Sequence, residues 1–438
     1  MKKDIVYSLV AKELRRQKEM IGLIPSENTV SPEVSRVLSS CLSNKYSEGY
    51  AGRRYYEGNQ VIDQIEFLAM DRIKKLFAVP YVNIQPYSGS PANFAIYFAL
   101  MQPGDTLMGL KLSMGGHLTH GHPKVTGSGR FYNSVQYGVK KNARIDFAEV
   151  EALAKKHKPK VIVAGNTAYP FELDFKKFRK IVDMVGAWLV ADISHVTGLV
   201  VAGEHMSPVP YADVIMSTTH KTFRGPRGAM IIVTDRGMKR DPELGKKIDS
   251  AIIPGLQGGP HNATTAAIAI AAGEASTAKF KKYAQQIRKN ATVLADRLMK
   301  NGISLVGNGT ETHLMVIDLT KYGPGLGTQA AFAMDVAGIY ANRNTVPDEQ
   351  GSPFYPSGIR IGTPLVTSRG MKEREMKKIA DWIAEVILHV KNQPLPDDKK
   401  ERAVFLKEFR KNALKDPVLK KIRREVRALT AGFPLFQS

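Results

Sequence analysis

The chain has 438 residues, of which 43% are hydrophobic and 24% charged, with a formal net charge of +22. This composition is typical of a globular protein with a large core, and the length favours two domains. No apolar run reaches the roughly 20 residues of a membrane helix, and the first residues lack the apolar stretch of a secretory signal. The single cysteine excludes an intrachain disulfide and a multi-cysteine metal site. We therefore expect a cytoplasmic globular protein.

The excess of positive charge is spread along the whole chain. Its densest block lies between Lys399 and Arg427, where apolar residues recur at helical spacing. This pattern favours basic amphipathic helices with a solvated face over a disordered basic tail. Nucleic-acid binding stays open as an alternative function, and it would show as a steep dependence of affinity on salt.

The first half of the chain begins with helices and continues as alternating strands and helices. Amphipathic helices are predicted over residues 4–21 and 61–77, with a short one that starts after Ser31. The alternation that follows predicts a mostly parallel sheet with helices on both faces. The predicted strands are 81–85, 106–109, 161–164, 187–191, 213–217 and 229–233, and the predicted helices between them are 92–101, 147–157 and 175–185.

The second half changes in pattern. Residues 260–299 are predicted as one long helical stretch, rich in alanine. Shorter strands and helices then alternate less regularly, which favours a smaller α+β domain. The expected domains are 1–280, an N-terminal arm with the large domain, and 281–438. In the second domain the predicted strands are 303–306, 313–318 and 359–361, and the helices are 329–337 and 372–391.

A lysine and an aspartate follow two of the predicted strands. Lys221 comes just after strand 213–217, between hydroxyl residues and a glycine-rich turn, and Asp192 closes strand 187–191. Pyridoxal phosphate requires a lysine amine for its imine and an acid for its pyridinium nitrogen. Since ligands bind at the carboxyl ends of parallel strands, the pair predicts a pyridoxal-phosphate site. Alternatively, Lys221 is a surface residue and Asp192 caps a turn.

Two strand-to-helix junctions are suited to a phosphate group. Ser88, Gly89 and Ser90 follow a predicted strand and open a helix with a proline in its first turn. Backbone amides at such a helix start bind anions, although any tight turn could use these residues. Gly259 lies in a second junction, before the long helix.

Three histidines, His117, His120 and His122, have a spacing that could suit zinc. No cysteine lies near them and the nearest acids are distant in sequence, so a metal is disfavoured. An imidazole stacked on a cofactor ring is the better function for His117. The other two are interpreted as structural histidines.

Two further segments carry charged residues in an apolar or aromatic setting. Arg360 lies in a short apolar strand, where a guanidinium needs an anion, either a substrate carboxylate or a structural ion-pair partner. Glu48 lies in a loop of glycines and tyrosines that includes Tyr46 and Tyr56. The glutamate could act as a general acid or base, or the tyrosines could form a nucleic-acid surface.

Taken together, these segments resemble the serine hydroxymethyltransferase family nearly end to end. It runs from residues 24–28 to 433–436, and the distinctive stretches are 46–56, 115–121, 218–228 and 357–369. The resemblance implies the fold of fold-type I pyridoxal-phosphate transferases. That fold has a large domain with a mostly parallel seven-stranded sheet between helices, and a smaller C-terminal α+β domain.

The resemblance implies a role for each matching position. The cofactor would be bound by Ser88, Gly89 and Ser90 at its phosphate, His117 on its ring, Asp192 at its ring nitrogen, Thr167 and His195 near its 3-oxygen, Lys221 through an imine, and Tyr46 and Gly259 from a partner subunit. Substrate would be handled by Ser26 and Arg360 at its carboxylate, Glu48 as the main proton-transfer group, and Tyr56, His195 and His220 beside it. The pterin site would be lined by Leu112, Gly115, Gly116, Leu118 and Asn344. No metal is implied.

The activity implied is reversible transfer of the serine hydroxymethyl carbon to a reduced pterin, giving glycine, by a homodimer with shared sites. A tetramer, and a modified pterin in place of tetrahydrofolate, stay open. The family usually has alanine where Pro25 and Ser194 stand, serine at Thr167 and glycine at Glu57. The alternative activity is a pterin-independent aldolase that acts on threonine or other β-hydroxy amino acids.

Overall fold

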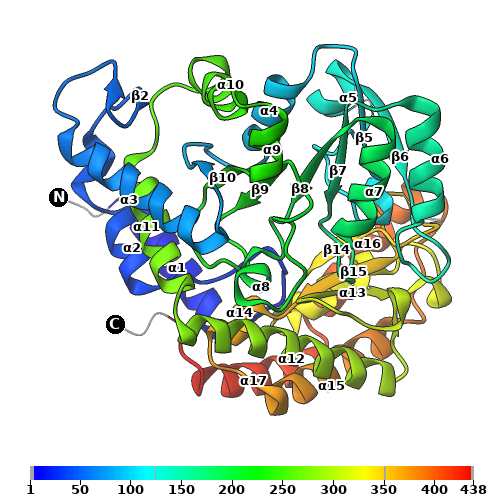
Figure 1. Ribbon diagram of the computed structural model, residues 1–438. Coiled ribbons are helices and arrows are strands. Elements are labelled where there is room, and N and C mark those ends of the chain that lie inside the picture. Colours follow the sequence, from blue (N-terminus) through cyan, green and yellow to red (C-terminus); the bar gives the residue numbers. More distant parts are fainter. Residues whose placement is uncertain (1–3, 124, 350–351, 436–438) are drawn as a thin grey trace. The chain divides into compact units, whose positions relative to one another are not determined.

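The computed structural model describes residues 4–123, 125–349 and 352–435 (Figure 1). They form two compact units, a larger one over Val30–Gln285 and a smaller one made of Met1–Thr29 and Gln286–Ser438. This division assigns the N-terminal segment to the same unit as the C-terminal part of the chain. The domains 1–280 and 281–438 stay a prediction.

The larger unit is built on a seven-stranded sheet. Its strand order is β4-β10-β9-β8-β7-β5-β6, and only β10 runs antiparallel to its neighbours. The α/β fold with a mostly parallel sheet is therefore confirmed. The strands are β4 Tyr81–Asn83, β5 Thr106–Leu110, β6 Asn133–Tyr137, β7 Val161–Gly165, β8 Trp188–Asp192, β9 Val214–Thr218 and β10 Ala229–Val233.

Helices flank this sheet, and Figure 1 shows α6 and α7 beside the β7-β5-β6 end. Alternate residues of the central strands, such as Val161, Val190 and Val214, pack with α4 in one core cluster, as the two-residue period of a strand requires. The helices are α2 Pro32–Leu38, α3 Gln60–Phe77, α4 Gly89–Leu100, α5 Gly127–Phe131, α6 Phe147–His157, α7 Phe175–Val185, α8 Thr197–Ala202, α9 Asp235–Arg240, α10 Leu244–Ser250 and α11 Asn262–Ala275, with short turns η1 Cys41–Asn44, η2 Leu112–Met114 and η3 Ala251–Leu256 and a hairpin of β2 Gly49–Tyr50 and β3 Arg53–Arg54.

The stretch predicted as one helix over 260–299 is two helices. α11 ends at Ala275, and α12 Ala278–Lys300 starts after Thr277, whose hydroxyl accepts a hydrogen bond from the backbone N–H of Phe280 at 3.2 Å. A threonine hydroxyl in this position caps a new helix start, which separates the two elements.

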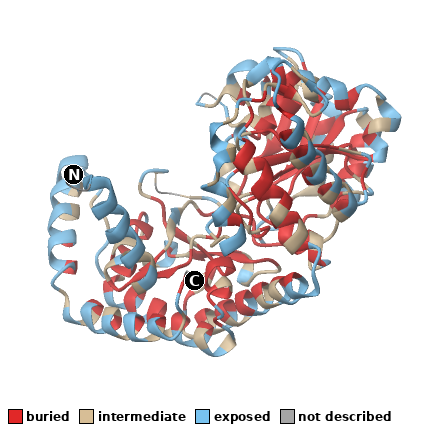
Figure 2. Cartoon of the chain, turned by 90° about the vertical axis from the view of Figure 1, so that its left-hand side faces the viewer, coloured by how far each residue is buried: buried red, intermediate tan, exposed pale blue. Residues whose placement is uncertain are grey.

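The smaller unit has a four-stranded antiparallel sheet in the order β11-β12-β15-β14, and a separate parallel pair of β1 and β13. Most of its core is one large apolar cluster, seen as the buried strands and inner helix faces in Figure 2, with a small second cluster around Met20 and Leu365. The strands are β1 Ile21–Gly22, β11 Ser304–Leu305, β12 Leu314–Asp318, β13 Ile339–Tyr340, β14 Asn342–Asn344 and β15 Gly358–Gly362, and the helices are α1 Ile5–Glu19, α13 Gly327–Val336, α14 Pro364–Ser368, α15 Glu373–Val390, α16 Lys399–Ala413 and α17 Pro417–Ala431, with turns η4 Val306–Asn308 and η5 Thr320–Tyr322.

The basic block near the C-terminus folds as α16 and α17, each with apolar residues buried on one side, as its pattern predicted. Within the described part of the chain, no helix is long and apolar enough to cross a bilayer.

Candidate functional site

The predicted acid and lysine lie at one edge of the large sheet. β8 ends at Asp192, and β9 runs parallel beside it with Met216 opposite Asp192 in register. Every residue of both strands is buried. Lys221 follows β9 closely, and its Nζ donates a hydrogen bond to the Oγ1 of Thr218 at 2.8 Å. The carboxyl ends of two neighbouring strands thus present the aspartate and the lysine loop on the same side, where ligands of such sheets bind.

Asp192 is a buried carboxylate that remains ionised. Its Oδ2 accepts hydrogen bonds from Asn93 at 3.1 Å and His120 at 2.9 Å, and its Oδ1 accepts the backbone N–H of Ser194 at 3.0 Å. Burial raises the pKa of Asp192, but the hydrogen bond and charge of His120 outweigh it and hold that pKa well below the ordinary 3.8. Because a carboxylate offers about four lone-pair positions, Oδ1 can accept a further N–H.

The histidine that pairs with Asp192 was not assigned a function from the sequence. His120 is fully buried, and its Nδ1 has no hydrogen-bond partner among the described residues. A Cβ at Gly165 would lie 2.6 Å from the Cβ of Asp192 and 2.9 Å from the Cε1 of His120, so the pair requires glycine there. A clue in the sequence was the buried acid itself, since such a group needs a cation or strong donors.

The segment before His120 holds the other predicted histidine. The Nδ1 of His117 lies 2.7 Å from the Oγ1 of Thr119, and the two imidazole rings of His117 and His120 are 5.4 Å apart and tilted. His117 is half-buried. Its ring is therefore only partly covered by the described residues.

The serine-glycine turn lies directly against the lysine loop. A Cβ at Gly89 would come within 2.7 Å of the Cγ2 of Thr218. Ser88 precedes α4 in extended conformation, and its side chain makes no capping hydrogen bond. The first turn of α4, which includes Ser90, is therefore suited to an anion through its amides and hydroxyls.

Gly115 and Gly116 allow the loop after β5 to pack tightly on the loop after β7. A Cβ at Gly116 would lie 1.9 Å from the carbonyl oxygen of Leu110, and Gly115 has φ of 100°. Thr167 holds this arrangement, because its hydroxyl donates to the carbonyl of Gly116 at 2.6 Å and its N–H to that of Gly115 at 2.8 Å.

Two further histidines lie near Lys221. The backbone carbonyl of His195 accepts the hydroxyl of Thr222 at 2.9 Å, and His195 is buried. Burial, with the charges of Lys221 and Arg227, lowers the pKa of His220 from 6.5 to about 3. The imidazole of His220 is therefore neutral at physiological pH.

A second cluster surrounds Glu48. Tyr56 donates its phenol to one carboxylate oxygen at 2.9 Å, and Tyr46 to the other at 3.4 Å. The two tyrosine rings meet edge to face at 5.5 Å. A Cβ at Gly259 would approach the ring of Tyr46 to 3.0 Å, and one at Gly258 would approach Glu48 equally closely. The structure thus brings the predicted residues of this loop together with the second glycine junction.

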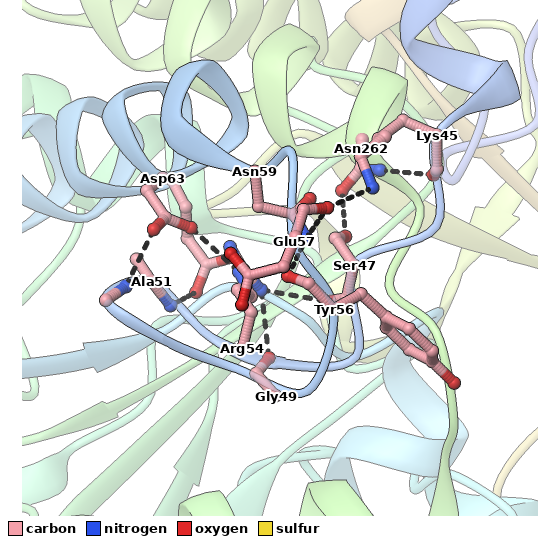
Figure 3. Close-up of polar contacts among 12 residues, drawn as sticks. Lys45, Ser47, Gly49, Ala51, Arg54, Tyr56, Glu57, Asn59, Asp63 and Asn262 are labelled. Atoms are coloured by element: carbon pink, nitrogen blue, oxygen red, sulfur yellow. Dashed lines mark hydrogen bonds and ion pairs between the residues drawn. The ribbon is translucent and has the colours of Figure 1, made fainter.

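Arg54 organises the loop that carries Glu48 (Figure 3). Its guanidinium donates to the backbone carbonyls of Ser47 and Gly49, each at 2.9 Å, which flank Glu48 on both sides. It also pairs with Asp63 at 2.8 Å and with buried Glu66 at 2.7 Å. In Figure 3 the Tyr56 ring projects away from this network. The sequence analysis did not single out Arg54, because its acidic partners lie on α3.

The smaller unit holds the remaining predicted residues. Arg360 lies in the middle of β15, its Nε donates to Asn342 at 2.9 Å, and burial lowers its pKa from 12.5 to about 10. The segment that carries Ser26 lies against the end of the same strand, since Gly362 donates its N–H to the Leu23 carbonyl at 2.7 Å. Three further candidates for the pterin site remain. Asn344 lies in β14 of this unit. In the larger unit, Leu112 lies at the start of η2 and Leu118 is exposed.

A mostly parallel sheet whose strand ends carry a lysine, a buried ionised acid and an anion-binding turn fits pyridoxal phosphate. The ring N–H of the cofactor would donate to Asp192, and its phosphate would bind at the start of α4. This combination defines the class of fold-type I pyridoxal-phosphate enzymes.

Comparison with known proteins narrows the class. The family model "Serine hydroxymethyltransferase" matches residues 1–383. A serine hydroxymethyltransferase of Acidothermus cellulolyticus is 52% identical over 430 residues, covering 98% of this chain and 95% of the relative. The enzyme of that name from Desulfotalea psychrophila is 52% identical, covering 87% of this chain and 88% of the relative. The one from Campylobacter jejuni is 50% identical, covering 90% of this chain and 94% of the relative.

The chain belongs to the serine hydroxymethyltransferase family. Membership implies pyridoxal phosphate as cofactor and a folate as co-substrate, and it does not favour the aldolase alternative.

Proposed function

We propose that this chain catalyses the reversible transfer of the serine hydroxymethyl carbon to a reduced pterin, giving glycine, with its cofactor bonded to the amine of Lys221. The observation that carries the proposal is the pairing at the strand ends. A buried, ionised Asp192 and the loop of Lys221 follow two adjacent parallel strands. Pyridoxal phosphate, when bound, supplies an electron sink for the electron pair of the bond that breaks.

Four groups would hold the cofactor. The Nζ of Lys221 would bond to the aldehyde carbon, and Asp192 would accept the N–H of the ring. The start of α4, at Ser88, Gly89 and Ser90, would bind the phosphate. Further contacts to the ring and its 3-oxygen would come from His117, Thr167 and His195.

His220 would serve the lysine as a neutral neighbour. Because its pKa is lowered to about 3, it adds no second positive charge beside Lys221 at physiological pH.

Arg360 and Ser26 would bind the carboxylate of serine or glycine. The guanidinium of Arg360 is largely desolvated, and its Nε donates to Asn342. A guanidinium is suited to hold a carboxylate by two parallel hydrogen bonds. A fixed carboxylate orients the remaining bonds of the substrate's α-carbon.

Glu48 would take and return the proton that moves with the hydroxymethyl carbon. Its two oxygens receive the phenols of Tyr46 and Tyr56, which fixes the orientation of the carboxylate. The hydrogen bond to Glu48 raises the pKa of Tyr56, so that phenol stays a donor.

The pterin would bind against Leu112, Gly115, Gly116, Leu118 and Asn344. Gly115 and Gly116 are buried, and their missing side chains let the segment between Leu112 and Leu118 pack closely on the neighbouring backbone. We propose tetrahydrofolate or a modified pterin as the carrier.

We also propose a homodimer with shared sites, in which Tyr46 and Gly259 reach the partner's cofactor; a tetramer of such dimers is also compatible. In support, Tyr46 is 58% exposed and Tyr55 is 69% exposed, more aromatic surface than a lone chain normally leaves in water. The free, exposed Cys41 supports a reducing, cytoplasmic compartment.

The test is serine cleavage by the purified protein with and without tetrahydrofolate. Strong stimulation by the pterin, with glycine formed in equal amount, is expected. Cleavage of β-hydroxy amino acids at the same rate without any pterin would instead establish the aldolase alternative.

A further inference from the structure

The loops after β8 and β9 are joined by side-chain hydroxyls. The Oγ1 of Thr197 lies 2.5 Å from the Oγ of Ser217. The Oγ1 of Thr222 donates to the His195 carbonyl at 2.9 Å and accepts the N–H of Gly198 at 3.0 Å. These contacts fix the loop of Asp192 to the loop of Lys221.

Ser194 connects the carboxylate of Asp192 to the backbone of Thr218. It is 5% exposed, and its backbone N–H donates to the Oδ1 of Asp192 at 3.0 Å. Its Oγ accepts the backbone N–H of Thr218 at 3.0 Å. The last paired residues of β8 and β9 are Asp192 and Met216, so the backbone N–H of Thr218 lies beyond the paired part of these two strands. The hydroxyl of Ser194 accepts this N–H, as a backbone carbonyl would do in a longer ladder.

Thr218 in turn touches both of the other groups that would hold the cofactor. Its Oγ1 accepts the Nζ of Lys221 at 2.8 Å, and its Cγ2 lies where a Cβ at Gly89 would clash. The backbone position of Thr218 therefore sets where the lysine amine and the phosphate turn lie relative to each other. A shift of about 1 Å in such a group is enough to impair a reaction strongly.

We propose that Ser194 is a positioning residue that holds Thr218, and through it the amine of Lys221, in register with the carboxylate of Asp192. The proposal rests on the proposed function of Lys221. Ser194 touches no reacting atom. Its hydroxyl sets the geometry with which the lysine meets the cofactor aldehyde, and it should therefore stabilise the covalent bond more than the noncovalent contacts.

A double-mutant cycle on cofactor binding tests this proposal. Apo-protein is titrated with pyridoxal phosphate, and the dissociation constant is measured for Ser194→Ala with Lys221 present and in the Lys221→Ala background. With Lys221 present, we expect affinity to fall about tenfold, which is the size of one lost hydrogen bond. In the Lys221→Ala background, the same change should alter affinity by less than about twofold.

The absorption spectrum gives a second readout. The pH at which the band of the lysine-linked cofactor changes should shift in Ser194→Ala, because the amine is held differently. A role confined to stability would lower the melting temperature and leave that pH unchanged.

Thr197→Val is the matched control. It removes a buried hydroxyl that donates to the Ile193 carbonyl and lies 2.5 Å from the Oγ of Ser217 in β9. This hydroxyl reaches Thr218 only through Ser217, which donates to the Thr218 carbonyl at 2.7 Å. We expect a lower melting temperature and a cofactor dissociation constant within about twofold of the wild type. Should Ser194→Ala not fold, Ser194→Cys keeps a side chain of similar shape with only a weak sulfur acceptor, and should show the same pattern with a smaller loss.

An equal loss of affinity in both backgrounds, or no loss in either Ser194 variant, would overturn the positioning role. If the wild-type protein itself shows no lysine-linked band, the proposed function fails, and the role of Ser194 fails with it. The two failures are therefore distinguishable from the wild-type spectrum alone.

Discussion

Two titratable side chains beside the lysine have pKa values lowered by different causes. Burial raises the pKa of Asp192, but the hydrogen bond and charge of His120 outweigh it, so this carboxylate is ionised. His220 is neutral because burial, with Lys221 nearby, disfavours its charged form. Near Lys221, Asp192 therefore carries a negative charge and the imidazole of His220 is uncharged.

The lowered pKa of His220 predicts how stability changes with pH. Between pH 6.5 and about 3 the unfolded chain binds a proton at this residue that the folded chain does not. The stability that this residue contributes is thus fully present above pH 6.5, and it falls as the pH drops towards 3 by at most about 1.4 kcal/mol per pH unit. In His220→Asn the free energy of unfolding of the apo-protein, measured with urea between pH 7 and 5, should fall less steeply.

A His220→Asn variant with the wild-type slope would show that this imidazole is not held neutral.

At the residue level, the sequence was sufficient to predict Lys221 and Asp192, but not the residues that hydrogen-bond to them. Asp192 was recognisable because it ends an apolar strand, and Lys221 because it closely follows the next one. Asn93 and His120 reach Asp192 across 99 and 72 residues of sequence, so only the folded sheet brings them together. Ser194 was noted as a departure from its family, but its partner Thr218 lies on the next strand.

At the element level, the most dependable predictions were the fully buried strands. Every residue of β7, β8, β9 and β10 is buried, and these strands are mostly apolar, so each was predicted within about one residue. β6 was missed because it lies at the sheet edge and only Tyr137 of its five residues is buried. The predicted long helix was wrong because a polar Ser276-Thr277 step was not recognised as a cap.

The loop that carries Glu48 depends on one arginine for its shape. The side chain of Arg54 is 4% exposed, and it neutralises Glu66, whose side chain is 2% exposed. Arg54→Met would leave that carboxylate buried without its cation, and should cost about 3–5 kcal/mol in the free energy of unfolding. Serine cleavage should fall further than stability explains, because the carbonyls on both sides of Glu48 lose their donor.

Arg53→Met is the neighbouring control. The side chain of Arg53 is 69% exposed and lies 3.6 Å from Asp249, so its removal should cost less than about 1 kcal/mol. Denaturant unfolding of both variants compares them directly. Equal costs for the two arginines would contradict the organising role of Arg54.

At the scale of the whole molecule, the N-terminal segment forms one unit with the C-terminal part of the chain, a long-range arrangement that residue patterns did not predict. The parallel pair of β1 and β13 explains it, because Ile21 pairs with Ile339. Such a contact depends on topology and has no local signal in the sequence.

Shared sites in a homodimer can be tested with hybrids. Tyr46→Ala and Lys221→Ala, each nearly inactive alone, are mixed, unfolded and refolded together. If Tyr46 serves the partner's lysine, half of the dimers are mixed and each contains one intact site, so about a quarter of wild-type activity should return. Activity no higher than that of the separate variants would show that both residues serve the same chain's site.

The most direct test of the central claim is to locate the bond between cofactor and protein. The protein is incubated with pyridoxal phosphate, reduced with borohydride and digested, and the labelled peptide is identified by mass spectrometry. The label should lie on Lys221 alone, and the visible band should be lost on reduction and be absent in Lys221→Ala. A label on any other lysine, or no label at all, would contradict the assignment of this site.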